Sequence, residues 1–189
     1  MSQPAGVAAA SLRSSEETPV SPGTLLDNWR QIIATGNLPG GRSMDGVSRW
    51  LLITRASVLS MTGVSAVSGG LLSAGHADAN WGLFAMSTIG LLVAHAANNM
   101  INDYFDVAEG VDTAGYVRVQ YAPHPILSGL ISKEGLLAAI ALLNALDLLI
   151  LAHIAQARGV AAVAFALAGL FISVFYVAPP LSLKHRGLG

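Results

Sequence analysis

The sequence contains no cysteine, so disulfide bonds, thiolate zinc sites, iron–sulfur ligation and cysteine nucleophiles are all excluded. It is also poor in charge: only 11% of its 189 residues are Asp, Glu, Lys or Arg, against roughly a quarter in ordinary soluble domains. The formal net charge of -1 leaves no overall basic field for binding nucleic acid. These shortages argue against a soluble enzyme and against a nucleic-acid-binding protein.

The apolar residues, 53% of the chain, are gathered into runs long enough to cross a bilayer. A hydrocarbon core of roughly 30 Å requires about 20 helical residues. Four runs approach or reach this length, and they cover residues 56–72, 81–101, 136–155 and 160–178. Because backbone groups in lipid must pair within their own segment, each run is expected to be a helix. The sequence therefore predicts an all-α, polytopic transmembrane helical bundle with four spans.

Two stretches precede the first span. Residues 1–23 are rich in Ser, Ala, Pro and Glu and lack the apolar core of a signal peptide, so a disordered tail is expected. In residues 24–48, apolar side chains recur at helical spacing from Leu25 to Ile33, which indicates a short interfacial helix followed by a linker. A linker throughout is the other interpretation. The membrane domain is then expected to cover residues 49–189.

The basic residues are divided unequally between the two ends of these spans. Nine of the ten lie before the first span, between the second and third, or after the fourth, and the opposite side has only Arg158. Lys and Arg are enriched in cytoplasmic loops. The sequence therefore predicts an integral, multi-pass membrane protein whose N-terminus, long connection between spans two and three, and C-terminal segment are cytoplasmic.

A polar stripe marks the C-terminal end of the second span. Its members are His95, Asn98, Asn99, Asn102, Asp103 and Asp106. On a helix, residues at these spacings fall within an arc of roughly 140°. An unpaired polar group in hydrocarbon is costly, so a stripe this wide must face protein or a water-filled cavity. By the orientation argument, the stripe runs toward the cytoplasmic surface.

Four acids lie close together at this end of the stripe: Asp103, Asp106, Glu109 and Asp112, with Arg118 as the nearby positive charge. Such a group repels itself unless a cation lies among its members. Asp103 and Asp106, one helical turn apart, suit a hard cation, and Mg²⁺ typically takes one or two carboxylates together with phosphate oxygens. The segment is therefore predicted to bind Mg²⁺ and a diphosphate. A hydrated acidic loop at a membrane surface is the alternative interpretation.

Three motifs, in order along the chain, resemble those of one family. NDYFDVAEGVD, residues 102–112, resembles the first aspartate-rich motif of the UbiA superfamily of intramembrane prenyltransferases. Its form is closest to that of the branch that prenylates 1,4-dihydroxy-2-naphthoate in menaquinone synthesis. HPILSGLIS, residues 124–132, resembles the RPxxSGxxS segment that follows it, and YVAPPLSLKHRGLG, residues 176–189, resembles the segment after the fourth helix.

This resemblance implies an enzyme that transfers a prenyl group from a polyprenyl diphosphate to an aromatic acceptor in the lipid bilayer. By the motif match, Asn102, Asp103 and Asp106 would be the catalytic residues that hold Mg²⁺ against the diphosphate. The candidate substrate-binding residues are Arg118, Lys184, Arg186, Asp112, Asn99 and Tyr176. A departing diphosphate develops negative charge, which the metal ion and the basic residues can neutralise. Tyr176 would either stabilise a carbocation or belong to the aromatic belt.

Two features depart from the family pattern. His124 stands where the family usually has Arg, which keeps a hydrogen-bond donor but loses a permanent bidentate cation. No segment matches the family's second aspartate-rich motif, similar to DxxxD, so the chain is expected to be a truncated member that holds the first half of the metal site. Two alternatives remain open: a catalytically inactive partner that binds prenyl diphosphate, and a fragment of an ion-coupled transporter.

Other residues within the spans have more general expected roles. Asp147 in the third span is an intramembrane carboxylate, for which either a function or a structural pairing with Asn99 or His95 is expected. His95 is expected to form a hydrogen bond between helices rather than to bind a metal ion. The glycines Gly63, Gly69 and Gly70 of the first span, like Gly169 of the fourth, are expected at positions of close helix packing.

Overall fold

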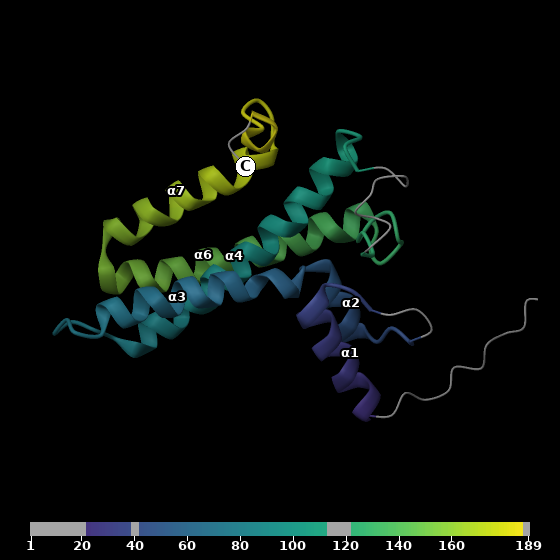
Figure 1. Ribbon diagram of the computed structural model, residues 1–189. Helices are drawn as coiled ribbons and strands as arrows, with labels where there is room; N and C mark the ends of the chain where they lie inside the picture. Colours follow the sequence, from purple (N-terminus) through teal and green to yellow (C-terminus); the bar gives the residue numbers. More distant parts are fainter. Residues whose placement is uncertain (1–21, 39–41, 113–121, 187–189) are drawn as a thin grey trace, which may run out of the picture.

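The computed structural model describes residues 22–38, 42–112 and 122–186, which are entirely helical apart from turns and connections (Figure 1). The helices are α1 (Pro22–Thr35), α2 (Gly46–Ile53), α3 (Leu59–Ser73), α4 (Trp81–Ala108), α6 (Lys133–Arg158) and α7 (Val160–Val177). Two short 3-10 segments, η1 (Ala56–Val58) and η2 (Leu183–Arg186), precede α3 and follow α7. Over these residues the all-α prediction is confirmed.

The N-terminal helix α1 lies across the long axes of α3, α4 and α6 in Figure 1, and it packs against α2 and η1. It begins at Pro22, two residues before the predicted start at Thr24. A helix that lies across the membrane spans in this way is oriented as expected for an interfacial helix, which lies in the plane of the membrane surface. The rest of the predicted disordered tail lies outside the described residues.

Capping side chains set the starts of three helices. Asp45, Asn80 and Ser132 stand immediately before α2, α4 and α6, and their side-chain oxygens accept hydrogen bonds from backbone N–H groups of the first turn. A single residue, Gly159, separates α6 from α7 and has a φ of 73°. This left-handed conformation favours glycine, so the sequence permits the sharp reversal there.

Within the described residues, three helical segments are long and apolar enough to cross a membrane: Ala56–Ser73, Trp81–Ala108 and Lys133–Arg158. The apolar helix Val160–Tyr176 is shorter, so the prediction of four spans is confirmed for three of them. Many large apolar side chains of these helices point outward, as Phe165 does with 80% of its surface exposed. Apolar surface of this extent is typical of a face in contact with lipid.

A buried core lies at one end of the bundle. Ile53 at the end of α2, Met100 of α4 and Leu136 in the first turns of α6 form one cluster, and each is at most 1% exposed. Close packing of this kind leaves little freedom for the elements that contribute to it. Because Asp103 and Asp106 follow Met100 within two helical turns, the core fixes the part of α4 that carries the predicted site.

Glycine has a packing role at one of the three predicted positions in α3. A Cβ atom on Gly70 would lie 2.3 Å from the ring of Phe84, so the approach of α3 to α4 requires glycine there. A Cβ atom on Gly63 or Gly69, or on Gly169 in α7, would meet nothing within 4 Å. The expectation of close packing is therefore confirmed for Gly70 and wrong for the other three glycines.

Candidate active site

The chain turns back on itself at the C-terminal end of α4. Gly110 has a φ of 70°, in the left-handed region that glycine adopts most readily. This reversal lets the backbone N–H of Asp112 donate to the carbonyl oxygen of Asp106 at 2.9 Å. Asp103, Asp106 and Asp112 are consequently buried at one helix end, with 0%, 4% and 5% of their surfaces exposed.

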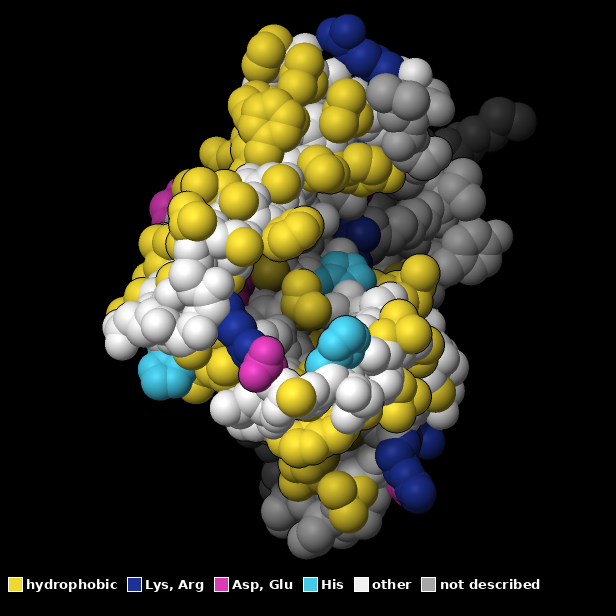
Figure 2. Space-filling view, turned by 90° about the vertical axis from the view of Figure 1, so that its left-hand side faces the viewer, with side chains coloured by type: hydrophobic (Ala, Val, Ile, Leu, Met, Phe, Trp, Pro, Cys, Tyr) yellow, Lys and Arg dark blue, Asp and Glu magenta, His cyan; other side chains and the backbone are white. Residues whose placement is uncertain are grey.

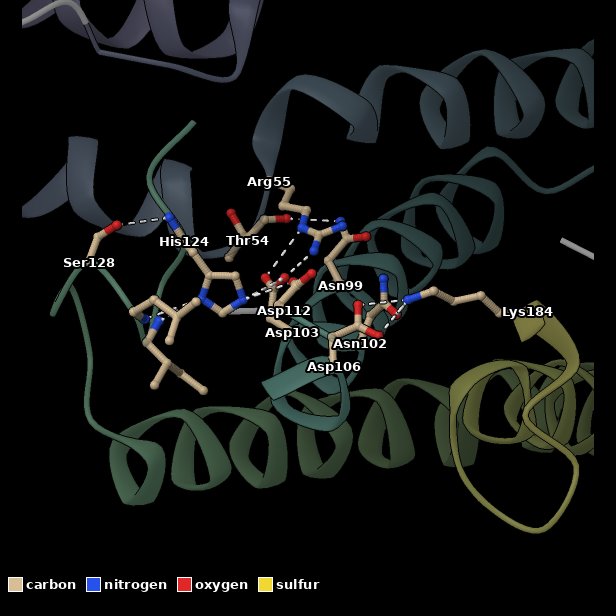
Figure 3. Close-up of polar contacts among 12 residues, drawn as sticks. Thr54, Arg55, Asn99, Asn102, Asp103, Asp106, Asp112, His124, Ser128 and Lys184 are labelled. Carbon is tan, nitrogen blue, oxygen red and sulfur yellow. Dashed lines mark hydrogen bonds and ion pairs between the residues drawn. The ribbon is translucent and has the colours of Figure 1, made fainter. Parts of the chain in front are cut away.

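One group of polar side chains surrounds Asp103 (Figure 3). The Nε of Arg55 donates to Oδ2 of Asp103 at 3.2 Å, and an Nη of the same guanidinium contacts Oδ1. The Nε2 of His124 lies 3.6 Å from Oδ1 of Asp103 and 3.3 Å from Oδ2 of Asp112. These four residues are called the Asp103 cluster below. Potential ligand atoms of Asp103, Asp112 and His124 lie within 4.8 Å of one another, which is close enough to share a metal ion.

A second group lies on the neighbouring turn of α4. The Nζ of Lys184, from η2, donates to the two carboxylate oxygens of Asp106 at 2.6 and 2.7 Å and to Oδ1 of Asn102 at 3.0 Å. Asn102, Asp106 and Lys184 are called the Asp106 cluster below. Three oxygen atoms thus converge on one positively charged group. The oxygen atoms of Asn102 and Asp106 therefore stabilise a positive charge at this position.

The junction between α2 and η1 positions Arg55. Arg55 itself has a φ of 53°, a left-handed conformation that is uncommon for a non-glycine residue. The preceding residue, Thr54, accepts a hydrogen bond at its carbonyl oxygen from Nδ2 of Asn99 at 3.0 Å. Asn99 therefore connects this junction to α4, and Arg55 faces Asp103 as a result.

The structure brings together five of the residues predicted for the site: Asn102, Asp103, Asp106, Asp112 and Lys184. Their sources are the end of α4, the turn after it and the 3-10 segment after α7. The predicted stripe and the two later motifs therefore meet at one end of the bundle. Whether these residues act in catalysis remains a prediction.

The other predicted site residues are not members of the two clusters as the structure describes them. Arg186 is exposed and donates to the carbonyl oxygen of Pro180 at 3.1 Å. Tyr176 is half-buried near the end of α7, and Asn99 contacts the backbone of Thr54 as described above. Arg118 lies outside the described residues.

Arg55 and His124 belong to the Asp103 cluster although neither was predicted as a site residue. Arg55 contributes to the orientation argument only as one of many basic residues that flank the first span. Its position directly before a span, opposite a stripe of buried carboxylates, is the signal that points to a pair. His124 stands out in the sequence only as a replacement for the arginine of the family motif.

Two polar residues inside the bundle can also be compared with expectation. Nδ1 of His95 and Oγ1 of Thr62 are 2.7 Å apart, so a hydrogen bond joins α4 to α3 as expected. Oδ1 of Asp147 is buried without a hydrogen-bond partner among the described residues. The suggested pairing of Asp147 with Asn99 or His95 is not formed.

A groove with a volume of about 750 Å³ lies between α3 and α4 and reaches α6 at its outer end. It runs from Thr62 and Leu91 to a polar mouth at His76, Asp78 and Arg158. Figure 2 looks onto this end of the molecule and shows the hollow with basic, acidic and histidine side chains around it. The guanidinium of Arg158 donates to the carbonyl oxygen of Asp78 at 2.6 Å.

Hydroxyl groups along the groove are bonded to their own helices. Ser65, Ser73 and Thr88 each donate to the carbonyl oxygen of a residue three or four positions earlier, at 2.8 to 2.9 Å. Such bonds satisfy the hydroxyl proton locally. The wall of the groove therefore presents mainly carbon to whatever occupies it.

Comparison with known proteins gives one match. The profile of the UbiA prenyltransferase family matches residues 63–189, a region that includes α4, the Asp106 cluster, and all of the Asp103 cluster except Arg55. No curated protein and no solved structure matches the chain significantly. Because the match extends over more than half of the residues, the chain belongs to the UbiA prenyltransferase family.

Proposed function

We propose that this protein binds Mg²⁺ and a polyprenyl diphosphate and transfers the prenyl group to an aromatic acceptor of the naphthoate type. Membership of the family implies a membrane prenyltransferase. The observation that carries the more specific proposal is the set of buried carboxylates that meets Arg55 and Lys184 at one helix end. The acceptor class rests on the form of the motif at residues 102–112.

The residues of this site fit a hard divalent cation. Carboxylate oxygens of Asp103 and Asp106 and the amide oxygen of Asn102 are the ligands that Mg²⁺ prefers. The convergence of oxygen atoms on the ammonium group of Lys184 supports a stable position for positive charge there. In this proposal Asn102, Asp103 and Asp106 hold the ion. When bound, it supplies neutralisation of the charge that develops on the departing diphosphate.

Lys184 and Arg55 provide the second source of positive charge. Both side chains reach the acidic end of α4, and charged donors of this kind bind phosphate oxygens strongly. We assign them to the oxygens of the diphosphate, where they stabilise negative charge as the allylic carbon–oxygen bond weakens. Asp112 is the outer carboxylate of the same site. Tyr176 keeps both roles predicted from the sequence, stabilisation of the allylic cation or membership of the aromatic belt.

The groove supports a position for the prenyl chain. Leu91, at its inner end, precedes Asp103 on α4 by a helical distance of about 18 Å. A diphosphate at the carboxylates would therefore direct its chain along α4 toward Thr62 and the groove. The predominantly apolar wall suits a hydrocarbon chain, and exclusion of water protects a reactive cation.

We also propose that the carboxylate end of the bundle faces the cytoplasm and that α7 forms a fourth span. Arg55 and Lys184 lie at this end, whereas Arg158 lies at the other. A reporter fused after Gly189 is expected on the cytoplasmic side, and one inserted near Ala77 on the external side. The reversed pattern would contradict the proposed orientation.

The proposed function is tested with the full chain in lipid nanodiscs, labelled farnesyl diphosphate, Mg²⁺ and 1,4-dihydroxy-2-naphthoate. Binding of the labelled diphosphate is expected to depend on Mg²⁺ and to be abolished by EDTA, and the label is expected in a prenylated naphthoate. Binding that is indifferent to EDTA would contradict the metal site. Transfer to a hydroxybenzoate in preference to the naphthoate would contradict the acceptor class alone.

A further inference from the structure

We infer that His124 is a positioning residue that stabilises the carboxylates of Asp103 and Asp112 electrostatically, through an Nε2–H group that lies close to both, and is not itself a metal ligand. This inference rests on the proposed function, because it assigns those carboxylates to the Mg²⁺ site. The imidazole is 2% exposed and lies between the two carboxylates and the loop that leads to α6 (Figure 3). Proximity alone would allow His124 to be a third ligand.

The hydrogen bonds of the ring decide between these roles. Nδ1 of His124 accepts from the backbone N–H groups of Ile126 and Leu127, at 3.2 and 3.3 Å. A ring nitrogen that accepts a hydrogen bond carries no proton, so the proton of the neutral imidazole lies on Nε2. This nitrogen faces Oδ2 of Asp112 at 3.3 Å and Oδ1 of Asp103 at 3.6 Å.

A nitrogen that carries a proton has no free lone pair for a metal ion. Histidines that bind metals show the opposite arrangement, since they donate the N–H of the second ring nitrogen to a carbonyl or carboxylate group. In this protein the second nitrogen of His124 accepts from backbone amides instead. The geometry therefore makes His124 a neutral imidazole whose Nε2–H group lies near Asp103 and Asp112 without completing a hydrogen bond to either carboxylate in this structure.

The loop around His124 fixes the direction of the ring. The backbone N–H of His124 donates to Oγ of Ser128 at 3.0 Å, and its carbonyl oxygen accepts from the N–H of Ser128 at 2.9 Å. The carbonyl of Pro125 accepts a further bond from the N–H of Leu130 at 2.9 Å. Rotation of the imidazole would break both of its bonds to backbone amides, so the donor remains aimed at the carboxylates.

This arrangement opposes the mutual repulsion of two buried carboxylates. Arg55 holds one side of Asp103, and the Nε2–H group lies between Asp103 and Asp112. Donors that orient metal ligands from outside the coordination sphere typically contribute a factor of roughly 10–100 to metal affinity. Removal of this donor is expected to weaken metal binding within that range.

Two substitutions separate the loop contact from the carboxylate contact. In His124→Asn, the side-chain oxygen can accept from the same backbone N–H groups, as Asn does in turns, but the side chain is too short to reach the carboxylates. In His124→Gln, an amide N–H group extends to the position of Nε2. The probe is Mn²⁺, which binds oxygen sites of the Mg²⁺ type and is observed by EPR in the full chain.

His124→Asn is expected to bind Mn²⁺ roughly 10–100-fold more weakly than the unaltered chain. His124→Gln is expected to recover part of the loss, with equal helix content in all three proteins by circular dichroism. Pulsed EPR of the unaltered chain with Mn²⁺ bound is expected to show no imidazole nitrogen coordinated to the ion. Detection of such a nitrogen would make His124 a ligand and overturn the inference.

Unchanged Mn²⁺ affinity in His124→Asn would also overturn the inference while leaving the proposed metal site in place. Failure of the unaltered chain to bind Mn²⁺ would overturn the proposed metal site, and the role given to His124 with it. The spectrum of the unaltered chain decides the question of ligation even if a variant fails to fold.

Discussion

The two ends of the bundle treat their polar groups in opposite ways. At the C-terminal end of α4, buried carboxylates meet side chains of opposite charge, as Asp103 meets Arg55 and Asp106 meets Lys184. At the other end, hydroxyl groups such as that of Ser73 bond to their own helix and leave the groove wall mainly apolar. Buried charge persists only where partners stabilise it. One end is therefore suited to an anionic head group and a cation, and the other to a hydrocarbon chain.

The largest expected effect comes from removing a charge at the acidic end. Asp103→Asn or Asp106→Asn is expected to reduce prenyl transfer at least a thousandfold, a loss of about 4 kcal/mol in transition-state stabilisation. Each substitution removes a negative charge of the proposed Mg²⁺ site, and membrane insertion is expected to be intact. Transfer of labelled prenyl groups and Mg²⁺-dependent diphosphate binding measure the effect.

Glu109→Gln is the matched control, because Glu109 is an exposed acid on the same segment. It is expected to retain near-normal transfer. Near-normal transfer in Asp103→Asn or Asp106→Asn would instead support the interpretation of the segment as a hydrated acidic loop.

Lys184→Met is expected to have the second largest effect. Loss of its ammonium group removes a cationic partner of Asp106 and a proposed donor to the diphosphate. Removal of one such donor typically reduces the rate by about 100-fold to 1,000-fold. Arg186→Met is the matched control, because Arg186 is exposed and contacts the carbonyl oxygen of Pro180. Equal kcat/KM losses in the two variants would remove Lys184 from the proposed site.

A change in the groove is expected to affect long prenyl chains selectively. Gly69 lines the groove, and a side chain there meets open space. Gly69→Leu should fill part of this volume and raise KM for a long polyprenyl diphosphate about tenfold, which is about 1.4 kcal/mol. Dimethylallyl diphosphate should be unaffected. Gly63→Leu is the control, since its side chain also meets open space but does not line the groove.

If Gly69→Leu affected short and long substrates equally, the groove would not hold the chain. The KM values for diphosphates of increasing length, measured with both variants, decide this.

The smallest effect is expected at Asp45, whose carboxylate has a structural role at the start of α2. Burial acts to raise the pKa of Asp45, but hydrogen bonds from the Ser48 side chain and from backbone and indole N–H groups outweigh it and lower the pKa. A carboxyl group whose pKa is lower in the folded state than in the unfolded state stabilises the folded state at pH values above its unfolded pKa of about 3.9. This stability is lost as the pH falls through the folded value.

Asp45→Ala is expected to destabilise the α1–α2 region by about 1 kcal/mol at pH 7. The difference from the unaltered protein should shrink as the pH falls below about 4, because the protonated carboxyl no longer caps the helix as well. Hydrogen exchange of amides in α1 and α2 of the full chain measures both the destabilisation and its dependence on pH. Asp27→Ala, at an exposed position of α1, is expected to change little.

Local patterns in the sequence were sufficient to predict the acidic part of the site. The stripe of α4 and the motif at residues 102–112 follow helical spacing and a single glycine turn, so their geometry depends on near neighbours. The span predicted for residues 81–101 and the helical stripe predicted to continue to Asp106 lie on one observed helix. The observed helix, Trp81–Ala108, continues through the polar stripe and ends just before Gly110.

Contacts between distant segments were harder to predict. Arg55 reaches Asp103 across 48 residues, from a junction whose left-handed backbone no spacing pattern indicates. The ring direction of His124 depends on a loop closed by Ser128. The groove arises from the packing of α3 on α4 at Gly70 and Phe84, and its volume depends on side-chain positions that hydrophobic periodicity does not specify.

The hydrogen bond from Asp112 to the carbonyl of Asp106 has a consequence for the order of folding. It closes a loop of only a few residues at Gly110, so the acidic half of the site forms with the end of α4 itself. Lys184 reaches Asp106 across 78 residues, and loop closure costs more chain entropy as the loop lengthens. Lys184 also follows α4 in the order of synthesis. During biogenesis the carboxylates at the end of α4 therefore exist before Lys184, and the arrival of the segment after α7 gives Asp106 its cationic partner.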